Sequence, residues 1–453
     1  MSFSRRRFLK TASATSIAAP WIGWSSTSEG GAPSEELRFA NFGGNGRAWS
    51  DLTEMLKAPN TSLVAVAEVD SARTNKVKES HPDVPIYADW RKLLDEKAKE
   101  LDAVVIGTPD HVHAPIAISA MQLGLAVYCE KPLTRTLHEC RVAQNLAAEN
   151  KLATQMGNQL ASGSGNRTAV KLLREGIVGK IISVHSMNPK SWGSMNPLPA
   201  PSEAVPESLD WDLWISVGKM REYIPREFHP SQWRKRIGYG TGTLGDMGCH
   251  IYHPWFMGLG HPETLSVISE GPAPVDGDSW PLNGLVKHQM KGTKESGGDF
   301  DFTWYDGNQK PGAEVAAALG VTDGPEGNAN RIPKSGSVVI GESGALVIPH
   351  GGSGKPVLYR DGTPSDEPIE MVGNEHHHTN FADAIRGKIS KPARCHFGYS
   401  GPMTEAVLLG TVAMQVPGEK LEWNSEKCRF RNSKKANDLL HEDYREGWEV
   451  KGV

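Results

Sequence analysis

The stretch LRFANFGGNGR at residues 37–47 decides the fold, because an apolar run there ends directly in a glycine-rich turn. The run at 37–42 predicts a β-strand, and a helix is expected over 47–56. Glycines in such a turn let backbone N–H groups at a helix N-terminus approach a phosphate. We therefore predict a phosphate-binding turn at residues 43–47, although Asn41 stands where the usual glycine fingerprint begins.

Short apolar runs alternate with amphipathic stretches as far as about residue 158. Nearly continuous apolar runs such as 63–69 are typical of parallel strands buried on both faces. The alternation predicts βαβ units and a doubly wound parallel sheet, the Rossmann arrangement. Strands are expected at 37–42, 63–69, 103–107, 126–129 and 153–156, and helices at 47–56, 72–80, 90–100, 113–123 and 137–150.

The pattern changes after residue 158, where a long Pro- and Trp-rich section (188–239) precedes several strands with few helices between them. Such a succession predicts an open, mainly antiparallel sheet. We divide the chain into a leader and linker (1–33), a Rossmann domain (34–157) and a C-terminal α/β domain (158–453). The expected later strands are 180–187, 284–290, 300–305, 337–340 and 346–348, and the expected helices are 168–175, 376–386 and 401–414.

An acidic residue, Glu68, ends the second predicted strand, 25 positions after Gly43. A carboxylate at this place accepts hydrogen bonds from the adenosine ribose and repels a 2′-phosphate, so NAD is favoured over NADP. Asp70 is the competing candidate for the ribose. Thr108-Pro109, after the strand 103–107, lies where a nicotinamide cofactor runs along the carboxyl edge of the sheet.

Glu130-Lys131-Pro132 follows the strand 126–129 directly, which points Lys131 toward the crevice where ligands bind. The proline restricts the backbone of the residue before it, so a positioned lysine is expected. The histidines His111 and His113 are expected to be surface residues of the turn before a helix, rather than catalytic groups.

Asp246, His250 and His253 are spaced i, i+4 and i+7, so on a helix they share one face. Three interpretations stay open: proton transfer by a carboxylate and an imidazole, metal ligation, or a polar helix face with a buried histidine. The tract 376–378 has three adjacent histidines, which point about 100° apart on a helix and do not converge on one ion. We expect no metal at either place.

Composition excludes several classes of protein. The chain has 453 residues and a net charge of −4, which gives no reason to expect a nucleic-acid partner. Its five cysteines form no CxxC pair, so a zinc site or a disulfide framework is not expected. No run of 18 apolar residues follows the N-terminus, so no stable membrane anchor is predicted.

The segment SRRRFLK (residues 4–10) resembles a twin-arginine export signal, and a mildly apolar stretch follows it. Such a signal implies the twin-arginine export machinery as a partner and a periplasmic location. Because this pathway carries folded proteins, a cofactor bound in the cytoplasm is expected to travel with the chain.

Six segments together resemble the glucose–fructose oxidoreductase / inositol dehydrogenase / MocA family, and in particular its exported branch. They are the turn 43–46, DAVVIGTPDHVHAP (102–115), YCEKPL (128–133), TQMG (154–157), GTLGDMGCH (242–250) and YSGPMTE (399–405). The resemblance implies a Rossmann domain, a C-terminal domain for substrate binding and oligomerisation, a nicotinamide cofactor, and a sugar, polyol or glycoside substrate. A homo-oligomer is expected.

The resemblance also implies roles for single residues. Lys131 would bind the reacting oxygen, His250 would be its acid and base, and Asp246 would orient the substrate and the imidazole. It further suggests a cis bond before Pro132, and it makes His253 a departure, since aspartate is common there. The residues expected to bind the cofactor are Gly43, Gly44, Asn45, Gly46, Arg47, Glu68, Thr108, Pro109, His113, Glu130 and Lys131.

Three functions are compatible with these motifs. The first is an NAD-dependent oxidoreductase that moves a hydride between a sugar carbinol carbon and the cofactor. The second is a lyase or glycosidase that oxidises its substrate only transiently. The third is a carbohydrate-binding protein without activity, which the retained Lys131, Asp246 and His250 argue against.

Overall fold

The computed structural model describes residues 36–322, 329–351 and 354–453, so the arginine motif at 4–10 lies outside the described residues. Six parallel strands form the N-terminal sheet in the order β3-β2-β1-β4-β5-β6. The doubly wound parallel sheet predicted from the sequence is confirmed. Its strands are β1 (Leu37–Phe42), β2 (Thr61–Ala67), β3 (Ile86–Tyr87), β4 (Ala103–Ile106), β5 (Ala126–Glu130) and β6 (Thr154–Gly157).

Helices flank this sheet at nearly the predicted places. The short strand β3 was not predicted, and the expected helix 72–80 is divided into a 3₁₀ turn and α2. The apolar strands β4 and β5 are buried along their whole length, which explains their uninterrupted apolar runs. The helices are α1 (Gly46–Met55), α2 (Asn75–Ser80), α3 (Trp90–Lys97), α4 (Asp110–Gln122) and α5 (Leu137–Glu149).

The ends of β1 and β4 come unusually close to the start of α1. A Cβ added to Gly107 would lie 2.7 Å from the Ala48 Cα, and one added to Gly43 would lie 2.5 Å from the Ala48 Cβ. Gly43 also has φ = +103°, a conformation that favours glycine. Glycine is therefore required at both positions for the helix to approach the sheet.

The C-terminal half forms a ten-stranded sheet in the order β14-β13-β12-β11-β7-β10-β9-β8-β15-β16. Only β7 and β10 pair in parallel among its described strands, so the mainly antiparallel sheet is also confirmed. The strands are β7 (Ile181–Asn188), β8 (Thr264–Ser269), β9 (Leu285–Met290), β10 (Phe300–Asp306), β11 (Gly336–Gly341), β12 (Gly344–Pro349), β13 (Val357–Arg360), β14 (Thr363–Pro364), β15 (Leu421–Asn424) and β16 (Arg429–Phe430).

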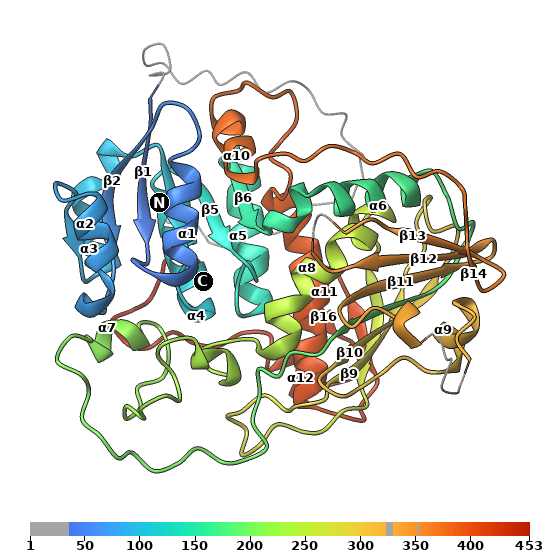
Figure 1. Cartoon of the computed structure of the whole chain (residues 1–453). Helices are drawn as coiled ribbons and strands as arrows, with labels where there is room; N and C mark the ends of the chain where they lie inside the picture. The colour runs from blue at the N-terminus through green and yellow to red at the C-terminus, as the bar shows by residue number, and fades with distance from the viewer. Residues whose placement is uncertain (1–35, 323–328, 352–353) are drawn as a thin grey trace, which may run out of the picture. The chain divides into compact units, whose positions relative to one another are not determined.

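Two long helices, α8 (Gly242–Gly258) and α11 (Phe397–Gln415), pack against each other and against this sheet (Figure 1). The helix α11 also contacts α5, and α10 (His377–Ile385) contacts α1, so helices from the C-terminal half reach the N-terminal sheet. A division of the chain at 157/158 stays a prediction. The remaining helices are α6 (Ser164–Arg174), α7 (Trp211–Ile215), α9 (Ala313–Ala318) and α12 (Lys434–Asn437).

The C-terminal residues return to α3 and α5, two of the helices that flank the N-terminal sheet. The backbone N–H of His138 donates to the Leu440 carbonyl oxygen at 3.0 Å, and the Tyr444 hydroxyl donates to Glu139 at 2.8 Å. The Arg91 guanidinium stacks 3.7 Å from the centre of the Trp448 ring. Both ends of the described chain therefore contribute to the same half of the molecule.

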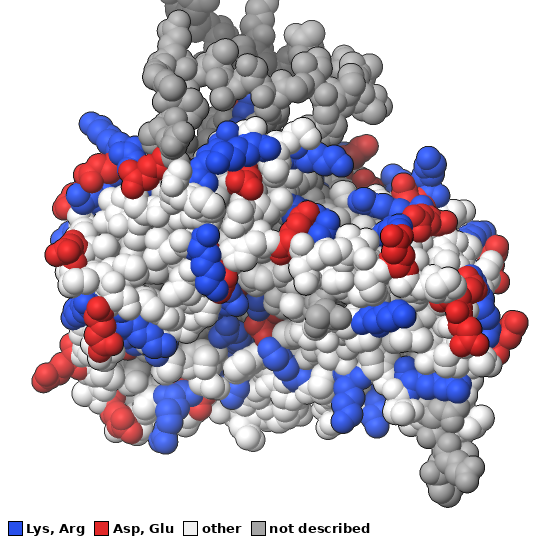
Figure 2. Space-filling view, turned by 45° about the horizontal axis from the view of Figure 1, so that its top comes forward, with Lys and Arg blue, Asp and Glu red and all other residues white. Residues whose placement is uncertain are grey.

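Among the described helices, none has the length and apolar character needed to cross a membrane. On the face shown in Figure 2, Lys and Arg side chains are interspersed with Asp and Glu side chains. This mixture agrees with the small net charge of −4.

Candidate active site

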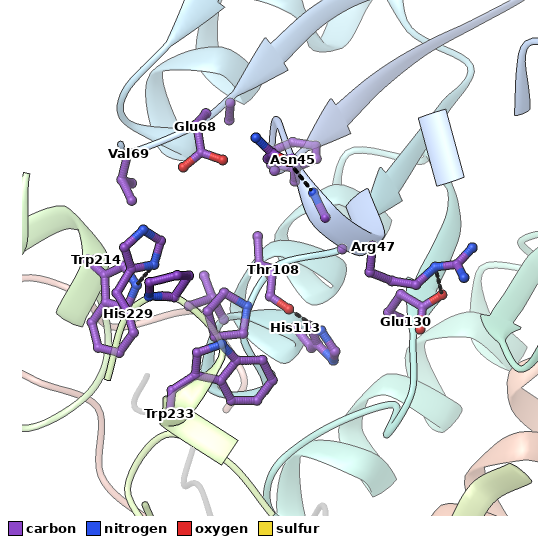
Figure 3. A pocket seen from close by; sticks show the side chains of 18 of the residues that line it. Asn45, Arg47, Glu68, Val69, Thr108, His113, Glu130, Trp214, His229 and Trp233 are labelled. Atoms are coloured by element: carbon purple, nitrogen blue, oxygen red, sulfur yellow. Dashed lines mark hydrogen bonds and ion pairs between the residues drawn. The ribbon is translucent and has the colours of Figure 1, made fainter. Parts of the chain in front are cut away.

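A cavity of about 270 Å³ lies at the carboxyl ends of β1, β2, β4 and β5, where ligands bind in doubly wound sheets. Figure 3 shows Asn45 and Glu68 on one side of it, and Trp214, His229 and Trp233 on the other. Ten of the residues expected to bind the cofactor line this cavity, and they are Gly43, Asn45, Gly46, Arg47, Glu68, Thr108, Pro109, His113, Glu130 and Lys131.

The glycine turn owes its shape partly to Asn41, the residue that departs from the fingerprint. Asn41 is fully buried, and its Nδ2 donates to the carbonyl oxygens of Gly43 at 2.7 Å and Ala48 at 3.3 Å. The side chain thus ties the turn to the first turn of α1. Asn45 caps the same helix by accepting a hydrogen bond from the Gly46 N–H.

The structure separates the two candidates for the ribose. Glu68 lines the cavity, and its Oε2 accepts a hydrogen bond from the Gly44 N–H at 2.8 Å. Gly44 is therefore near the cavity without lining it. The Asp70 carboxylate instead caps the turn at Ala72 and lies 3.0 Å from the His229 Nε2. Glu68 is the acid that the geometry offers to a ligand.

The expectation of surface histidines at 111 and 113 is wrong, because both side chains are buried. The ring nitrogens of His113 lie 2.8 Å from the Pro132 carbonyl oxygen and 2.9 Å from that of Thr108. The His111 Nε2 lies 3.0 Å from the Trp214 carbonyl oxygen. These histidines hold strand ends and the following segments in place around the cavity.

Glu130 belongs to a buried cluster at the edge of the cavity. Burial, together with the nearby Asp51 carboxylate, raises the pKa of Glu130 to about 7. The Arg47 guanidinium lies 2.7 Å from an Asp51 oxygen and 3.4 Å from a Glu130 oxygen. Arg47 therefore supplies the positive charge that stabilises two adjacent carboxyl groups.

Lys131 reaches across to α8. Its Nζ donates to Oδ1 of Asp246 at 2.7 Å and to the Asp246 carbonyl oxygen at 2.8 Å. The peptide bond between Lys131 and Pro132 is cis, as the family resemblance suggested. The sequence-predicted pair is therefore brought together at the end of β5.

Asp246 is surrounded by further donors that were not predicted from the sequence. Trp192 Nε1 donates to Oδ2 at 2.8 Å, while Lys190 Nζ lies 3.2 Å from Oδ2 and Arg234 Nε 3.1 Å from Oδ1. Although burial alone would raise the pKa of Asp246, the three cations hold it well below its usual range. The carboxylate is ionised at any physiological pH.

His250 is held by Asn158 rather than by Asp246. Its Nδ1 lies 2.6 Å from the Asn158 Oδ1, and the Nδ2 of the same amide donates to the Cys249 carbonyl oxygen at 2.8 Å. A carbonyl only accepts, so the amide oxygen must face the imidazole and Nδ1 must carry its proton. Burial and the positive charge of Lys131 lower the pKa of His250 well below its usual range. The ring is thus neutral, with a lone pair on Nε2.

His253 does not share this arrangement. It is fully buried, and its Nδ1 shares a 2.7 Å hydrogen bond with the Tyr399 hydroxyl. Seven residues along α8 keep it on the same face as Asp246 but place it about two turns, roughly 10 Å, further along the helix, where it packs against Tyr399. The spacing therefore predicted the helix correctly but not a three-residue site.

The three adjacent histidines join α10 to the N-terminal half. His376 caps α10 and lies 2.9 Å from Glu54, His377 contacts the Met156 carbonyl oxygen, and His378 lies 3.2 Å from Asp51. His378 also stacks on the Tyr128 ring. Across the described part of the chain, no group of three or more His, Cys, Asp or Glu side chains is arranged to hold a metal ion.

One wall of the cavity comes from the Pro- and Trp-rich section, for which the sequence predicted no regular structure. In Figure 1 this green segment runs past the carboxyl ends of the N-terminal strands. It is fixed there by a backbone hydrogen bond from the Asp210 N–H to the Val69 carbonyl oxygen at 3.0 Å. Its contribution to the lining is Leu213, Trp214, His229, Pro230, Ser231, Trp233 and Arg234.

Two parts of the chain match models of one known protein family. Residues 37–158 match the NAD-binding Rossmann fold of the Gfo/Idh/MocA oxidoreductases, and residues 169–279 match their C-terminal α/β domain. The two matches cover just over half of the chain. The chain belongs to the Gfo/Idh/MocA oxidoreductase family. The resemblance found in the sequence motifs is thereby confirmed at the level of the family.

Relatives within the Gfo/Idh/MocA family are similar over shorter stretches. Levoglucosan dehydrogenase from Pseudarthrobacter phenanthrenivorans is 28% identical over 165 residues, which are 36% of this chain and 34% of that protein. Glycosyl hydrolase family 109 protein 1 from a Shewanella species is 27% identical over 161 residues, 33% of this chain and 35% of that protein. The similarity thus spans about a third of the length of each curated relative.

The fold of the Gfo/Idh/MocA family extends over most of the chain. An inositol dehydrogenase homologue from Azotobacter vinelandii, solved with NADH and myo-inositol, superposes with a TM-score of 0.55. The superposition covers 86% of this chain and 98% of that one, at 16% identity. At this identity the likeness establishes the shared fold alone.

Proposed function

We propose that the protein is an NAD-dependent oxidoreductase that transfers a hydride between a sugar, polyol or glycoside carbon and a tightly held nicotinamide cofactor. One observation carries the proposal: Lys131 lines the cavity and is hydrogen-bonded to Asp246 on α8, the helix that also carries the neutral His250. A cation that lines the cavity is thus paired with a carboxylate, and a neutral imidazole follows four residues later on the same helix, which are the groups that such a hydride transfer would use.

The residues of the cavity fit such a cofactor. The N-terminus of α1 and the close approach at Gly43 and Gly107 suit a pyrophosphate. Within the described residues, the Thr108 Oγ1 is buried without a hydrogen-bond partner, so a ligand group is needed to satisfy it. Glu68 would take the ribose hydroxyls and disfavour a 2′-phosphate, although Arg73 lines the same cavity and would attract one.

The chain's own residues then divide the work. Lys131 donates a hydrogen bond to the reacting oxygen and stabilises negative charge on it as the C–H bond breaks. The Nε2 of His250 accepts the hydroxyl proton, and Asp246 holds Lys131 in position. Bound NAD supplies the acceptor for the hydride that leaves the carbinol carbon. The alcohol becomes a carbonyl, and the reverse reaction returns the proton from Nε2.

The direct test uses purified holoenzyme, a panel of sugars, polyols and glycosides, and the absorbance of NADH. We expect NADH formation with at least one compound, and its loss in His250→Asn. The control is His441→Asn, because His441 is an exposed histidine outside the cavity. Equal activity of the two variants would contradict the assignment of the base.

A second candidate is redox-neutral cleavage of a glycoside by transient oxidation. The similarity to a Shewanella protein named as a glycosyl hydrolase favours it. Cleaved glycoside without net NADH, detected by mass spectrometry in the same assay, would select this alternative.

We also propose that residues 4–10 direct export by the twin-arginine machinery and that the protein works in the periplasm as a homo-oligomer. The motif SRRRFLK supports the first part, and the family resemblance supports the last. An exported enzyme meets no nicotinamide pool, so NAD(H) should stay bound through many turnovers. The net reaction is then either redox-neutral or coupled to a second substrate or carrier that takes the hydride from the bound NADH. Activity of dialysed enzyme without added NAD tests this, and fractionation with native mass spectrometry tests the location and oligomer.

A further inference from the structure

The carboxylate of Asp246 has more positive partners than its charge requires. Lys131 already forms a 2.7 Å ion pair with it, yet Lys190 and Arg234 lie 3.2 Å and 3.1 Å from the same group. Throughout the described ranges, neither Lys190 nor Arg234 forms an ion pair with any other acid. Three cations therefore share one carboxylate.

Two further acids of this region do not pair with these cations. Asp110 is buried and accepts a hydrogen bond from the Thr241 hydroxyl, and Glu130 pairs with Arg47. Among the described residues, Asp246 is therefore the one acid within ion-pair distance of the three cations, and the directly contacting groups carry an excess of positive charge. This differs from the surface in Figure 2, where charges of both signs are interspersed.

The excess charge lies in a partly enclosed place. The side chains of Lys131 and Arg234 are 11% and 23% exposed, and only Lys190 is about half exposed, at 50%. The Arg234 guanidinium lies 4.2 Å from the centre of the Trp233 ring and 5.4 Å from that of Trp192. A cation in such surroundings loses hydration, and an unbalanced one is costly unless an anion arrives.

The position of Lys190 indicates where that anion sits. Arg234 lines the cofactor cavity, whereas Lys190, which follows the end of β7, does not. The cofactor phosphates belong at the turn 43–46, and Figure 3 shows Asn45 of that turn across the cavity from Trp233. An anion held by both Lys190 and Arg234 therefore lies on the substrate side of Asp246.

We propose that the substrate is an anionic sugar, whose carboxylate or phosphate group is bound by Lys190 and Arg234. This inference rests on the proposed sugar oxidoreductase function and narrows its substrate class. Lys131 and His250 then act on a hydroxyl of the same sugar. Lys190 and Arg234 are specificity-determining residues here, because they bind a group that does not react.

The test compares matched pairs of probes: D-glucuronate with D-glucuronamide, D-galacturonate with D-galacturonamide, D-gluconate with D-gluconamide, and glucose 6-phosphate with glucose. For at least one pair, kcat/KM of the holoenzyme should be about tenfold or more higher for the anion, as expected for hydrogen bonds to a charged group. A higher kcat/KM for one of the three carboxylates would identify the anionic group of the substrate as a carboxylate. A higher kcat/KM for glucose 6-phosphate would identify it as a phosphate.

Lys190→Gln should lower this anion-to-neutral ratio about tenfold, mainly through KM. Lys287→Gln is the matched control, because Lys287 lies on β9, does not line the cavity and pairs with Glu270. This control substitution should leave the anion-to-neutral ratio unchanged. A ratio near one in every pair, or a ratio that Lys190→Gln leaves unchanged, would overturn the inference.

Calorimetric binding of the same pairs separates this inference from the proposed function. If no probe yields NADH, preferential binding of an anion that requires Lys190 still supports the substrate site, while the oxidoreductase proposal fails. If neutral sugars are oxidised with the same kcat/KM as the anions and bind with the same affinity, the oxidoreductase proposal stands and the proposed anion site is wrong.

Discussion

Replacement of Asn158 by aspartate should raise the pKa of His250 and so move the pH dependence of catalysis. In the wild type, the Asn158 Oδ1 accepts a hydrogen bond from the Nδ1 of His250 at 2.6 Å. An aspartate would place a negative charge at the same point and favour the protonated ring. Since the base must be neutral, activity should fall on the acid side of the profile.

The size of the effect follows from the distance. With charge centres about 4 Å apart and an effective dielectric constant of about 20, the attraction is about 4 kcal/mol. At about 1.36 kcal/mol per pKa unit, this is a rise of about three units, and screening reduces it to roughly two. A raised pKa keeps the ring protonated to higher pH, so the acid limb of kcat/KM should move upward by roughly two to three pH units.

The assay measures kcat/KM for NADH formation against pH with the best compound from the sugar panel. Asn308→Asp is the control, because Asn308 is exposed, follows the end of β10 and does not line the cavity. Melting curves check the fold, since the new carboxylate also faces the Cys249 carbonyl oxygen. An acid limb that stays within about half a unit of wild type in a folded Asn158→Asp variant would refute the role of the imidazole as base.

Three further predictions concern the cavity and its frame. Lys131→Ala should lower kcat by roughly 10²–10³ with an unchanged circular dichroism spectrum, because Asp246 keeps two other cations; near-normal turnover would show that the lysine is dispensable. Glu68→Ser should shift the ratio of NADPH to NADH affinity toward NADPH by roughly tenfold in fluorescence titrations, because the repulsion of a 2′-phosphate is removed. An unchanged ratio would show that Glu68 does not select the cofactor. Gly107→Ala should reduce the free energy of unfolding in urea by about 1–3 kcal/mol, because its Cβ would lie 2.7 Å from the Ala48 Cα. Gly312→Ala is the control, because its Cβ would have no atom within 4 Å, and it should change the free energy of unfolding by less than about 1 kcal/mol. Equal effects of the two substitutions would show that the short distance between Gly107 and Ala48 does not require glycine.

Local patterns predicted most of the N-terminal sheet, since its strands are buried apolar runs with a clear period. In the C-terminal half, the sequence predicted the strands with the longest apolar runs and omitted β8 and β13 to β16. The hairpin between β13 and β14 turns at Asp361 and Gly362, with φ of +46° and +72°. Its second strand has two residues, which is too short to show any period.

The site was only partly accessible to sequence reasoning. Glu68 and Lys131 follow buried strands, so their position at the carboxyl edge could be derived. Asn158 follows β6 in the same way, and that position was the available signal for it. Trp214 and Arg234 come from a segment without periodicity, and their place against the cavity depends on contacts with distant residues such as His111.

The return of residues 438–453 to the helices of the N-terminal half sets an order on folding during biosynthesis. The first half of the chain leaves the ribosome early, yet His138, Glu139 and Arg91 find their partners only in Leu440, Tyr444 and Trp448, and Glu139 and Tyr444 are 305 positions apart. The nucleotide-binding half therefore gains these contacts only after residues 438–453 have been translated, and the contacts are among the most distant along the chain. Under the proposed export of the folded chain, docking of residues 438–453 would be the signal that both halves have been made.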